Sequence, residues 1–547
     1  MGRDLAMSKL QLLILNVAVL LCLNGFTQEH DHGSGEKLGT VHFSTSCSAG
    51  AQQEFDRAVA LLHSFQFSKA ILGFNAALKQ DSTCGVAYWG IALSQWSNPF
   101  SAGLKDKEQL KAGRETVELG KTVGAKTERE RAYIAAVANL YRDFENTTQR
   151  ARLLAYRDAM ADVAAKHPDD SEAQIFYALS ISAAEDLADK TYAGRLKAGA
   201  ILEKLFAEEP NHPGLAHYII HTYDVPPLAP RALDAARRYS DIAPDAPHAL
   251  HMPSHTFTRT GYWQDSINTN ILAAAAAKRE HQTAEELHAS DYEVYAYLQT
   301  SQDTAAHRIL DALPEIQSRF DPKTLIAGAG PPAAGYFALA AIPARYALER
   351  GDWKQAAQLT VRDTPFPYTE AMTWFARGVG SARLGQPKPA YDSAAALSQI
   401  RERLLKLGEN YWALQVQIQQ VEVEAWAKLA EGKKQDALRQ MQFGAGLEDG
   451  TEKSAITPGP LAPARELFGE MLLATNHPAA ALVQFEQTLK KEPGRFRALY
   501  GAGKAAQLAG NAEASRKYFS DLMKVCEKAD RSARPELEVA AKVVKQE

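Results

Sequence analysis

The sequence predicts an all-α protein, a right-handed solenoid of stacked helical hairpins. Its alanine-rich composition with few β-branched runs favours helices. Apolar residues recur at spacings of three and four, which places them on one face of a helix. Matching small and aromatic residues recur 34 positions apart near the C-terminus. The 547 residues exceed what one hydrophobic core usually serves, and a repeat array accommodates that length.

The chain begins with a segment typical of an export signal. Arg3 and Lys9 precede an apolar run over residues 10–23. The run is shorter than a good membrane span and lies at the terminus, as the core of a signal peptide does. We therefore predict a signal peptide over residues 1–27 and an exported protein, periplasmic or extracellular. A membrane anchor is the alternative reading of this run, and no membrane span is expected in the mature chain.

The next segment, residues 28–50, is polar and irregular, which predicts a flexible leader. Cys47 and Cys84 flank the first predicted hairpin. In an oxidising compartment the two thiols could close a disulfide. The alternative is a pair of small packing residues that are not bonded to each other.

Helical hairpins are expected from residue 51 onward. The stretch 55–78 predicts two helices with a tight turn near residues 64–67. Near the C-terminus, the small and aromatic pair at 480 and 485 recurs at 514 and 519, as is typical of tetratricopeptide repeats (TPR). The predicted order is N-terminal hairpins over 51–160, a central region over 161–312, a long connection over 313–335, hairpins over 336–446, a polar connection over 447–463, and C-terminal repeats with a capping helix over 464–547.

Histidines form the most informative pattern in the chain. Six of the fifteen lie between residues 212 and 255. His217 and His221 form one couple and His251 and His255 another, each with a spacing that puts both rings on one helix face. The two couples are separated by one repeat of 34 residues, so they occupy equivalent positions on neighbouring hairpins.

These positions correspond to the part of a TPR helix that lines the concave groove. The register of the following repeats adds an imidazole, an acid, a phenol and a guanidinium to the same groove. The predicted groove residues are His217, His221, His251, His255, His288, Asp291, Tyr295 and Arg345.

Imidazole ligands together with a carboxylate suit Zn, Fe, Cu or Ni. The four paired histidines, with Asp291 or His288, therefore form a candidate metal site. The glutamate of the HExxH metalloprotease motif is missing from both couples, so a zinc-protease mechanism is not expected.

Three functions fit these observations. The first is a binding module whose His-rich groove receives a protein, a peptide or a small polar ligand. The second is a metal-binding protein or metalloenzyme in the same groove. The third is an assembly factor for exported proteins. Histidines that merely pack between helices are the structural alternative. The net charge of -4 provides no basic field for nucleic acid, and the sequence does not decide whether a reaction is catalysed.

Several segments resemble a group of exported bacterial TPR proteins, and the resemblance extends over nearly the whole mature chain. They are Leu-Gly-Thr-Val-His-Phe-Ser-Thr-Ser-Cys at 38–47, Ala-Tyr-Trp-Gly-Ile-Ala at 87–92, Asn-Pro-Phe at 98–100, His-Met-Pro-Ser-His at 251–255 and Thr-Pro-Gly-Pro at 457–460. The stretch 251–255 is also similar to that of the animal tetratricopeptide repeat protein thirty-eight family. The resemblance implies a helical superhelix and implies no particular reaction.

Overall fold

The repeating helical pattern of the sequence forms successive hairpins in a computed structural model, which describes residues 35–101, 103–530 and 534–545. Helices are the regular secondary structure of these residues, and they contain no β-strand. The predicted all-α solenoid of TPR-like hairpins is confirmed. The predicted signal peptide over residues 1–27 lies outside the described residues.

The N-terminal helices pair along the chain and begin at recognisable caps. Asp106 caps α5 through its side chain, and Thr127 forms a capping box with Glu130 at the start of α6. The helices are α2 (Ala49–His63), α3 (Phe67–Gln80), α4 (Val86–Trp96), α5 (Lys107–Val123), α6 (Glu128–Ala138), α7 (Gln149–Lys166), α8 (Ser171–Ala183) and α9 (Ala193–Glu208).

Prolines start several helices of the central region, where the missing backbone N–H costs no helical hydrogen bond. Pro253 divides the first helix of one hairpin into two pieces, residues 247–251 and residues 253–260. Met252 lies between them and keeps helical φ and ψ angles of -55° and -35°. The elements are α10 (Pro213–Thr222), the 3₁₀ turn η1 (Ala229–Ala232), α11 (Leu233–Ile242), α12 (Pro247–His251), α13 (Pro253–Thr260), α14 (Trp263–Arg279), α15 (Thr283–Gln299) and α16 (Asp303–Arg319).

The C-terminal helices are separated by short turns. Gly385 and Gly510 follow α19 and α25 with positive φ angles of 73° and 79°, a conformation that glycine adopts without strain. The helices are α17 (Pro332–Glu349), α18 (Trp353–Ala357), α19 (Pro367–Arg383), α20 (Pro387–Lys406), α21 (Asn410–Ala430), α22 (Lys434–Asp449), α23 (Ala464–Ala474), α24 (Pro478–Lys491), α25 (Phe496–Leu508), α26 (Ala512–Val525) and α27 (Pro535–Lys545).

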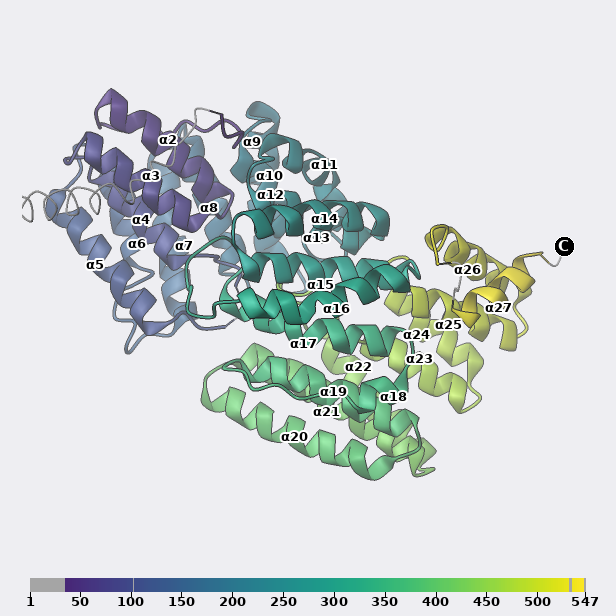
Figure 1. The fold of residues 1–547 in the computed structure, drawn as a ribbon. Helices are drawn as coiled ribbons and strands as arrows, with labels where there is room; N and C mark the ends of the chain where they lie inside the picture. The colour runs from purple at the N-terminus through teal and green to yellow at the C-terminus, as the bar shows by residue number, and fades with distance from the viewer. Residues whose placement is uncertain (1–34, 102, 531–533, 546–547) are drawn as a thin grey trace, which may run out of the picture. The chain divides into compact units, whose positions relative to one another are not determined.

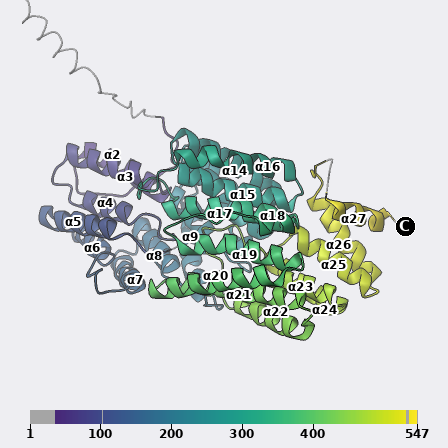
Figure 2. The same ribbon diagram turned by 60° about the horizontal axis from the view of Figure 1, so that its bottom comes forward.

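Neighbouring hairpins stack through their first helices. The helix α15 packs on α17, α17 on α19 and α19 on α21. The helices α20, α21 and α22 also lie side by side, as both views show (Figure 1, Figure 2). Each hairpin thus buries its apolar face against the next, as in a solenoid. No helix of the described residues has the length and apolar character needed to cross a membrane.

The expected flexible leader over residues 28–50 is corrected in its second half. Phe43 is fully buried, and its ring lies 5.0 Å from that of Trp89. Cys47 and Cys84 form a disulfide with an S–S length of 2.06 Å. The segment from Leu38 therefore packs on the first hairpins because it contributes an aromatic side chain to their core.

Three predicted boundaries also shift. The connection predicted over 313–335 spans residues 320–331, because α16 continues to Arg319 and buries Leu313 and Ile316. The connection predicted over 447–463 spans 450–463, because α22 continues to Asp449. The boundary at residue 160 falls inside α7, so a helix runs across it.

Candidate metal centre and adjacent pocket

Six histidines from four helices gather in the interior of the central region. The first helices of the neighbouring hairpins pack together here, α10 on α13 and α12 on α15. Every one of the six side chains is buried, with at most 7% of its residue surface exposed. They are His217 and His221 of α10, His248 and His251 of α12, His255 of α13 and His288 of α15.

The first trio consists of His217, His221 and His248, whose ligand nitrogens lie within 4.8 Å of one another. His217 donates from Nδ1 to the backbone oxygen of His63 at 2.6 Å, and His248 Nδ1 lies 2.7 Å from Glu285 Oε1. Their Nε2 atoms and both ring nitrogens of His221 have no hydrogen-bond partner among the described residues. Metal-ligating histidines typically direct the other ring nitrogen to a carbonyl or a carboxylate, as here.

The second trio consists of His251, His255 and His288, again with ligand nitrogens within 4.8 Å of one another. His251 Nδ1 lies 2.7 Å from Asn270 Oδ1, and His255 Nδ1 lies 3.0 Å from Asp224 Oδ2. The Asn270 amide is oriented by its own donation from Nδ2 to the Ser266 carbonyl at 2.7 Å. The acceptors opposite them place the hydrogens of His251 and His255 on Nδ1.

The consequence is an unusual contact between two acceptors. The Nε2 atoms of His251 and His255 face each other at 3.1 Å, each with its lone pair. Two lone pairs at this distance repel unless a proton or a cation lies between them. Two nitrogen ligands of one tetrahedral ion, with metal–nitrogen bonds of about 2.0–2.1 Å, lie about 3.3 Å apart. The separation therefore fits a pair of metal ligands.

Burial disfavours an extra proton on these imidazole rings, which leaves a cation as the better explanation of the contact. Loss of hydration, followed by the neighbouring imidazoles, lowers the pKa of His217, His221 and His251 well below the usual 6.5. The pKa of His288 falls to about 3, with burial again the main cause. Neutral imidazoles keep their lone pairs available for a metal ion.

A third group lies beside the first trio but differs in its hydrogen bonding. Both carboxylate oxygens of Glu172 are used, at 2.9 Å from His63 Nε2 and 3.1 Å from His212 Nε2. His63 Nδ1 accepts from the Tyr218 hydroxyl at 3.0 Å. Within this group, only His212 Nδ1 lacks a partner among the described residues. Neutral rings and one carboxylate satisfy the other ring nitrogens and the carboxylate, and the group fixes His63, whose backbone carbonyl accepts from His217.

A small cavity joins the two trios. It has a volume of about 20 Å³ and is lined by two histidines of each trio, His221 and His248 with His255 and His288. A cavity of about 10–15 Å³ already holds one water molecule. The two long connections close it through residues 329–331 and 455–456. A larger cleft of about 540 Å³ reaches His221 and Asp224.

The other predicted groove residues, Asp291, Tyr295 and Arg345, form hydrogen bonds within the protein and belong to neither trio. Arg345 donates to Asp291 at 2.8 Å, to Thr457 Oγ1 at 2.7 Å and to the Gly459 carbonyl at 2.8 Å. Tyr295 donates to Glu492 at 3.3 Å. These residues are buried and hold the 450–463 connection in place. The sequence leaves undecided whether the groove is open, and in the structure this connection covers the face that carries the histidines.

The sequence pattern did not single out His248, which belongs to the first trio. One repeat earlier its position holds Gly214, so the 34-residue period does not mark it. Its signal in the sequence is the spacing of three before His251. Asp224, Asn270 and Glu285 lie 19 or more residues from the rings they bind, and no local pattern identifies them.

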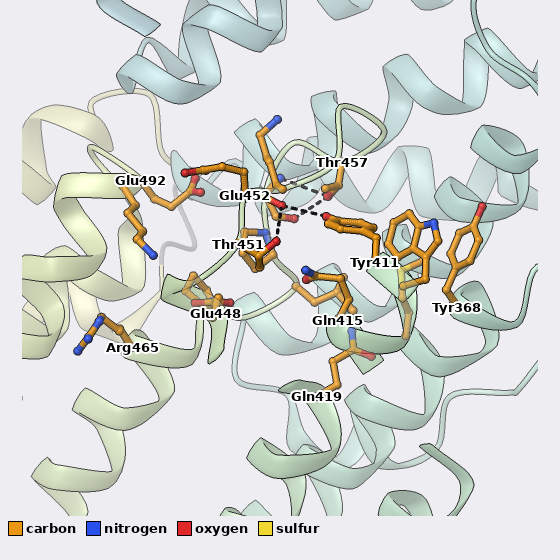
Figure 3. Close-up of a pocket in the computed structure, with 18 of the residues that line it drawn as sticks. Tyr368, Tyr411, Gln415, Gln419, Glu448, Thr451, Glu452, Thr457, Arg465 and Glu492 are labelled. Carbon is orange, nitrogen blue, oxygen red and sulfur yellow. Dashed lines mark hydrogen bonds between the residues drawn. The ribbon is translucent and has the colours of Figure 1, made fainter. Parts of the chain in front are cut away.

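A second cavity of about 110 Å³ lies between α17, α19, α21 and the 450–463 connection. Figure 3 shows Tyr368 and Tyr411 at one end of this pocket and Arg465 and Glu492 at the other. Lys453 belongs to its wall and also lies 3.1 Å from Asp224 Oδ2. Asp224 therefore connects the wall of the pocket with the second histidine trio.

Comparisons with known proteins provide no functional assignment. No model of a protein family matches the chain, and no functionally curated protein matches its sequence. A human IFIT1 dimer with m7Gppp-AAAA aligns over 89% of this chain and 97% of its own at 10% identity, with a TM-score of 0.34. A human IFIT1 dimer with PPP-AAAA aligns over 89% and 96% at 11% identity, with a TM-score of 0.36. Scores this low carry no argument.

Proposed function

We propose that this chain is an exported metal-binding protein in which a helical-repeat scaffold holds one transition-metal ion in each of two histidine trios. The observation that carries the proposal is the 3.1 Å approach of the Nε2 atoms of His251 and His255, whose Nδ1 hydrogens are already directed to Asn270 and Asp224. The unpartnered Nε2 atoms of His217 and His248 support a second ion in the first trio.

The donor set defines the class of metal. Six neutral imidazoles suit Zn, Fe, Cu or Ni and do not suit Mg or Ca, which prefer oxygen ligands. Three protein ligands per ion leave a coordination position for a small exogenous ligand. The cavity of about 20 Å³ between the trios has room for one such ligand. The proposal concerns binding and assigns no reaction.

Export is the second part of the proposal. The Cys47–Cys84 disulfide supports it, because disulfides persist in oxidising compartments and are rare in the cytosol. The apolar N-terminal run agrees with this location. Recovery of the native protein from the cytoplasmic fraction would contradict it.

A protein or peptide partner is not proposed for the histidines themselves. Their burial beneath residues 329–331 and 455–456 leaves no surface on which a polypeptide could lie. A small polar ligand has a better candidate position in the neighbouring cavity of about 110 Å³.

The test is metal analysis of the purified mature protein after challenge with Zn, Cu, Ni and Fe and extensive dialysis. We expect one ion to be retained for each trio. His251→Ala/His255→Ala should lose the ion of the second trio and keep that of the first. His307→Ala is the matched control, because this side chain is 50% exposed and lies on α16. A folded wild-type protein that retains none of the four metals would refute the proposal.

A further inference from the structure

We propose that the cavity beside α21 binds a neutral, hydroxyl-rich organic ligand such as a saccharide unit. The cavity is separate from the histidine trios, so this inference does not depend on metal binding. Its argument rests on the hydrogen-bonding groups, the charges and the aromatic surfaces of its walls.

The first observation is a row of unsatisfied polar atoms. Trp412, Gln415 and Gln419 line the cavity at spacings of three and four, which places them on one face of α21. Trp412 Nε1, Gln415 Nε2 and Gln419 Oε1 are buried and have no hydrogen-bond partner in the described part of the chain. The hydroxyl of Tyr368, which lines the same cavity from α19, has none either.

Such a row is costly without a ligand. A buried polar atom with no partner loses its hydrogen bonds to water and gains none in the protein, and native proteins contain few such atoms. Two of these groups donate, the Gln419 oxygen accepts, and the Tyr368 hydroxyl does either. A ligand that satisfies all four must therefore carry both donors and acceptors. Hydroxyl groups meet this requirement, since each one donates and accepts.

The second observation concerns charge. Each basic side chain of the wall forms an ion pair with a carboxylate of the protein. The pairs are Arg259 and Lys453 with Asp224, Arg345 with Asp291, and Arg465 and Lys491 with Asp449. The carboxylates of Glu448, Glu452 and Glu492 line the same wall, so charges of both signs surround the cavity and neither sign dominates. The unpartnered atoms of Trp412, Gln415, Gln419 and Tyr368 belong to uncharged groups, which favours an uncharged ligand.

The third observation is a cluster of aromatic rings at one end of the cavity. The ring of Tyr368 stacks on that of Trp412 with centroids 4.0 Å apart and planes inclined by 10°, and Tyr411 meets Trp412 edge to face at 5.0 Å. Figure 3 shows Tyr368 and Tyr411 at the same end of the pocket. The stacking covers one face of Tyr368 and one face of Trp412, and the remaining ring surface of the cluster provides apolar contact area at low entropic cost. The C–H groups of a sugar ring can contact this cluster while its hydroxyls reach the two glutamines.

The 450–463 connection favours a compact ligand over an extended polypeptide. The Ser454 backbone N–H donates to the Tyr411 hydroxyl at 2.7 Å, and the Pro460 carbonyl accepts from Arg345 at 3.1 Å. The connection is thereby fixed across the cavity at two points. An extended peptide needs a groove that continues past this point, whereas a saccharide unit does not.

The test is calorimetric titration of the full chain with neutral mono-, di- and trisaccharides, alongside a blocked tripeptide and free glutamate. Tryptophan fluorescence reports binding independently through Trp412. We expect binding by a neutral saccharide. Gln415→Leu should weaken the affinity about tenfold, as expected for one lost hydrogen bond, and Trp412→Phe should weaken it while keeping an aromatic ring.

Gln420→Leu is the matched control, since Gln420 lies on the same helix and donates to Glu424 away from the cavity. It should leave the affinity unchanged. Circular dichroism and cooperative denaturant unfolding establish that each variant is folded, whatever the outcome of the titration. If no neutral saccharide binds, or if the blocked tripeptide or glutamate binds and the saccharides do not, the inference is refuted.

Discussion

At the scale of single residues, the chemistry of the site depends on which ring nitrogen carries a hydrogen. His63 and His251 are both fully buried, yet only His251 directs a lone pair at another lone pair. The difference comes from the partners, because a carboxylate and a hydroxyl satisfy both nitrogens of His63. Burial alone therefore does not identify the site, whereas an account of each hydrogen bond does.

The same burial predicts how the metal-free protein responds to pH. The folded pKa values of His217, His221 and His251 lie well below the value near 6.5 that these groups have in the unfolded chain. Below pH 6.5 the unfolded chain binds protons that the folded chain does not. The free energy of unfolding should then fall by up to about 1.4 kcal/mol per pH unit for each group.

Urea unfolding in EDTA at pH 7.5, 6.5 and 5.5 measures this dependence. Glu285 has a lowered pKa because of His248, and its effect appears only below its unfolded value of about 4.5. In His221→Gln the slope between pH 6.5 and 5.5 should be smaller by about 1 kcal/mol per pH unit, because the unfolded imidazole is half protonated at the start of this interval. An unchanged slope would show that His221 is protonated in the folded protein.

At the scale of elements, the hairpins pack a large ring against small residues. The ring of Phe485 on α24 lies where a Cβ added at Gly501 of α25 would approach it to 2.4 Å. A Cβ added at Gly469 of the preceding helix, α23, would lie 2.8 Å from the same ring. This contact explains why an aromatic residue and small residues recur at fixed offsets in the repeat.

Gly501→Ala should therefore lower the free energy of unfolding by about 1–3 kcal/mol, because a well-packed seam does not accept an extra methyl group. Gly446→Ala is the matched control. Gly446 lies within α22, and a Cβ there meets no described atom within 4 Å. This control should raise the free energy by up to about 1 kcal/mol through helix propensity. If denaturant unfolding gave the same change in the free energy of unfolding for Gly501→Ala and Gly446→Ala, the packing explanation would be ruled out.

At the scale of the solenoid formed by residues 38–530, the connections decide what is accessible. The 320–331 connection approaches the first hairpin, where the Ser68 N–H donates to the Ala327 carbonyl at 3.0 Å. The 450–463 connection reaches back to Asp224 through Lys453. Segments distant in sequence thus cover the histidines, which makes the site a closed centre with a side cleft at His221.

The Cys47–Cys84 disulfide fixes the N-terminal segment to the first hairpin across a sequence separation of 37 residues. Cys47→Ser/Cys84→Ser should lower the free energy of unfolding by about 2–4 kcal/mol, chiefly because the unfolded chain is less constrained. Denaturant unfolding measures the change, and reduction of the unaltered protein should produce the same loss. A loss confined to the reduced wild type, absent in the double variant, would contradict this account.

The helices, the repeat and the neighbourhood of the site could be predicted from local patterns in the sequence. Helical spacing and the 34-residue period are local properties, so they placed His217, His221, His251 and His255 on equivalent helix faces. The same reasoning could not find His248 as a ligand, because its position does not recur in the preceding repeat.

Which rings share a trio, which ring nitrogens lack a partner and whether the histidine face is covered all depend on packing between distant segments. His288 joins His251 and His255, while Asp291 pairs with Arg345 instead of a metal. These outcomes depend on contacts between groups up to 229 residues apart, such as Lys453 with Asp224. Local periodicity specifies the helix face on which a side chain lies. The packing of distant connections sets the burial and the hydrogen bonds of the imidazole rings, and therefore their chemistry.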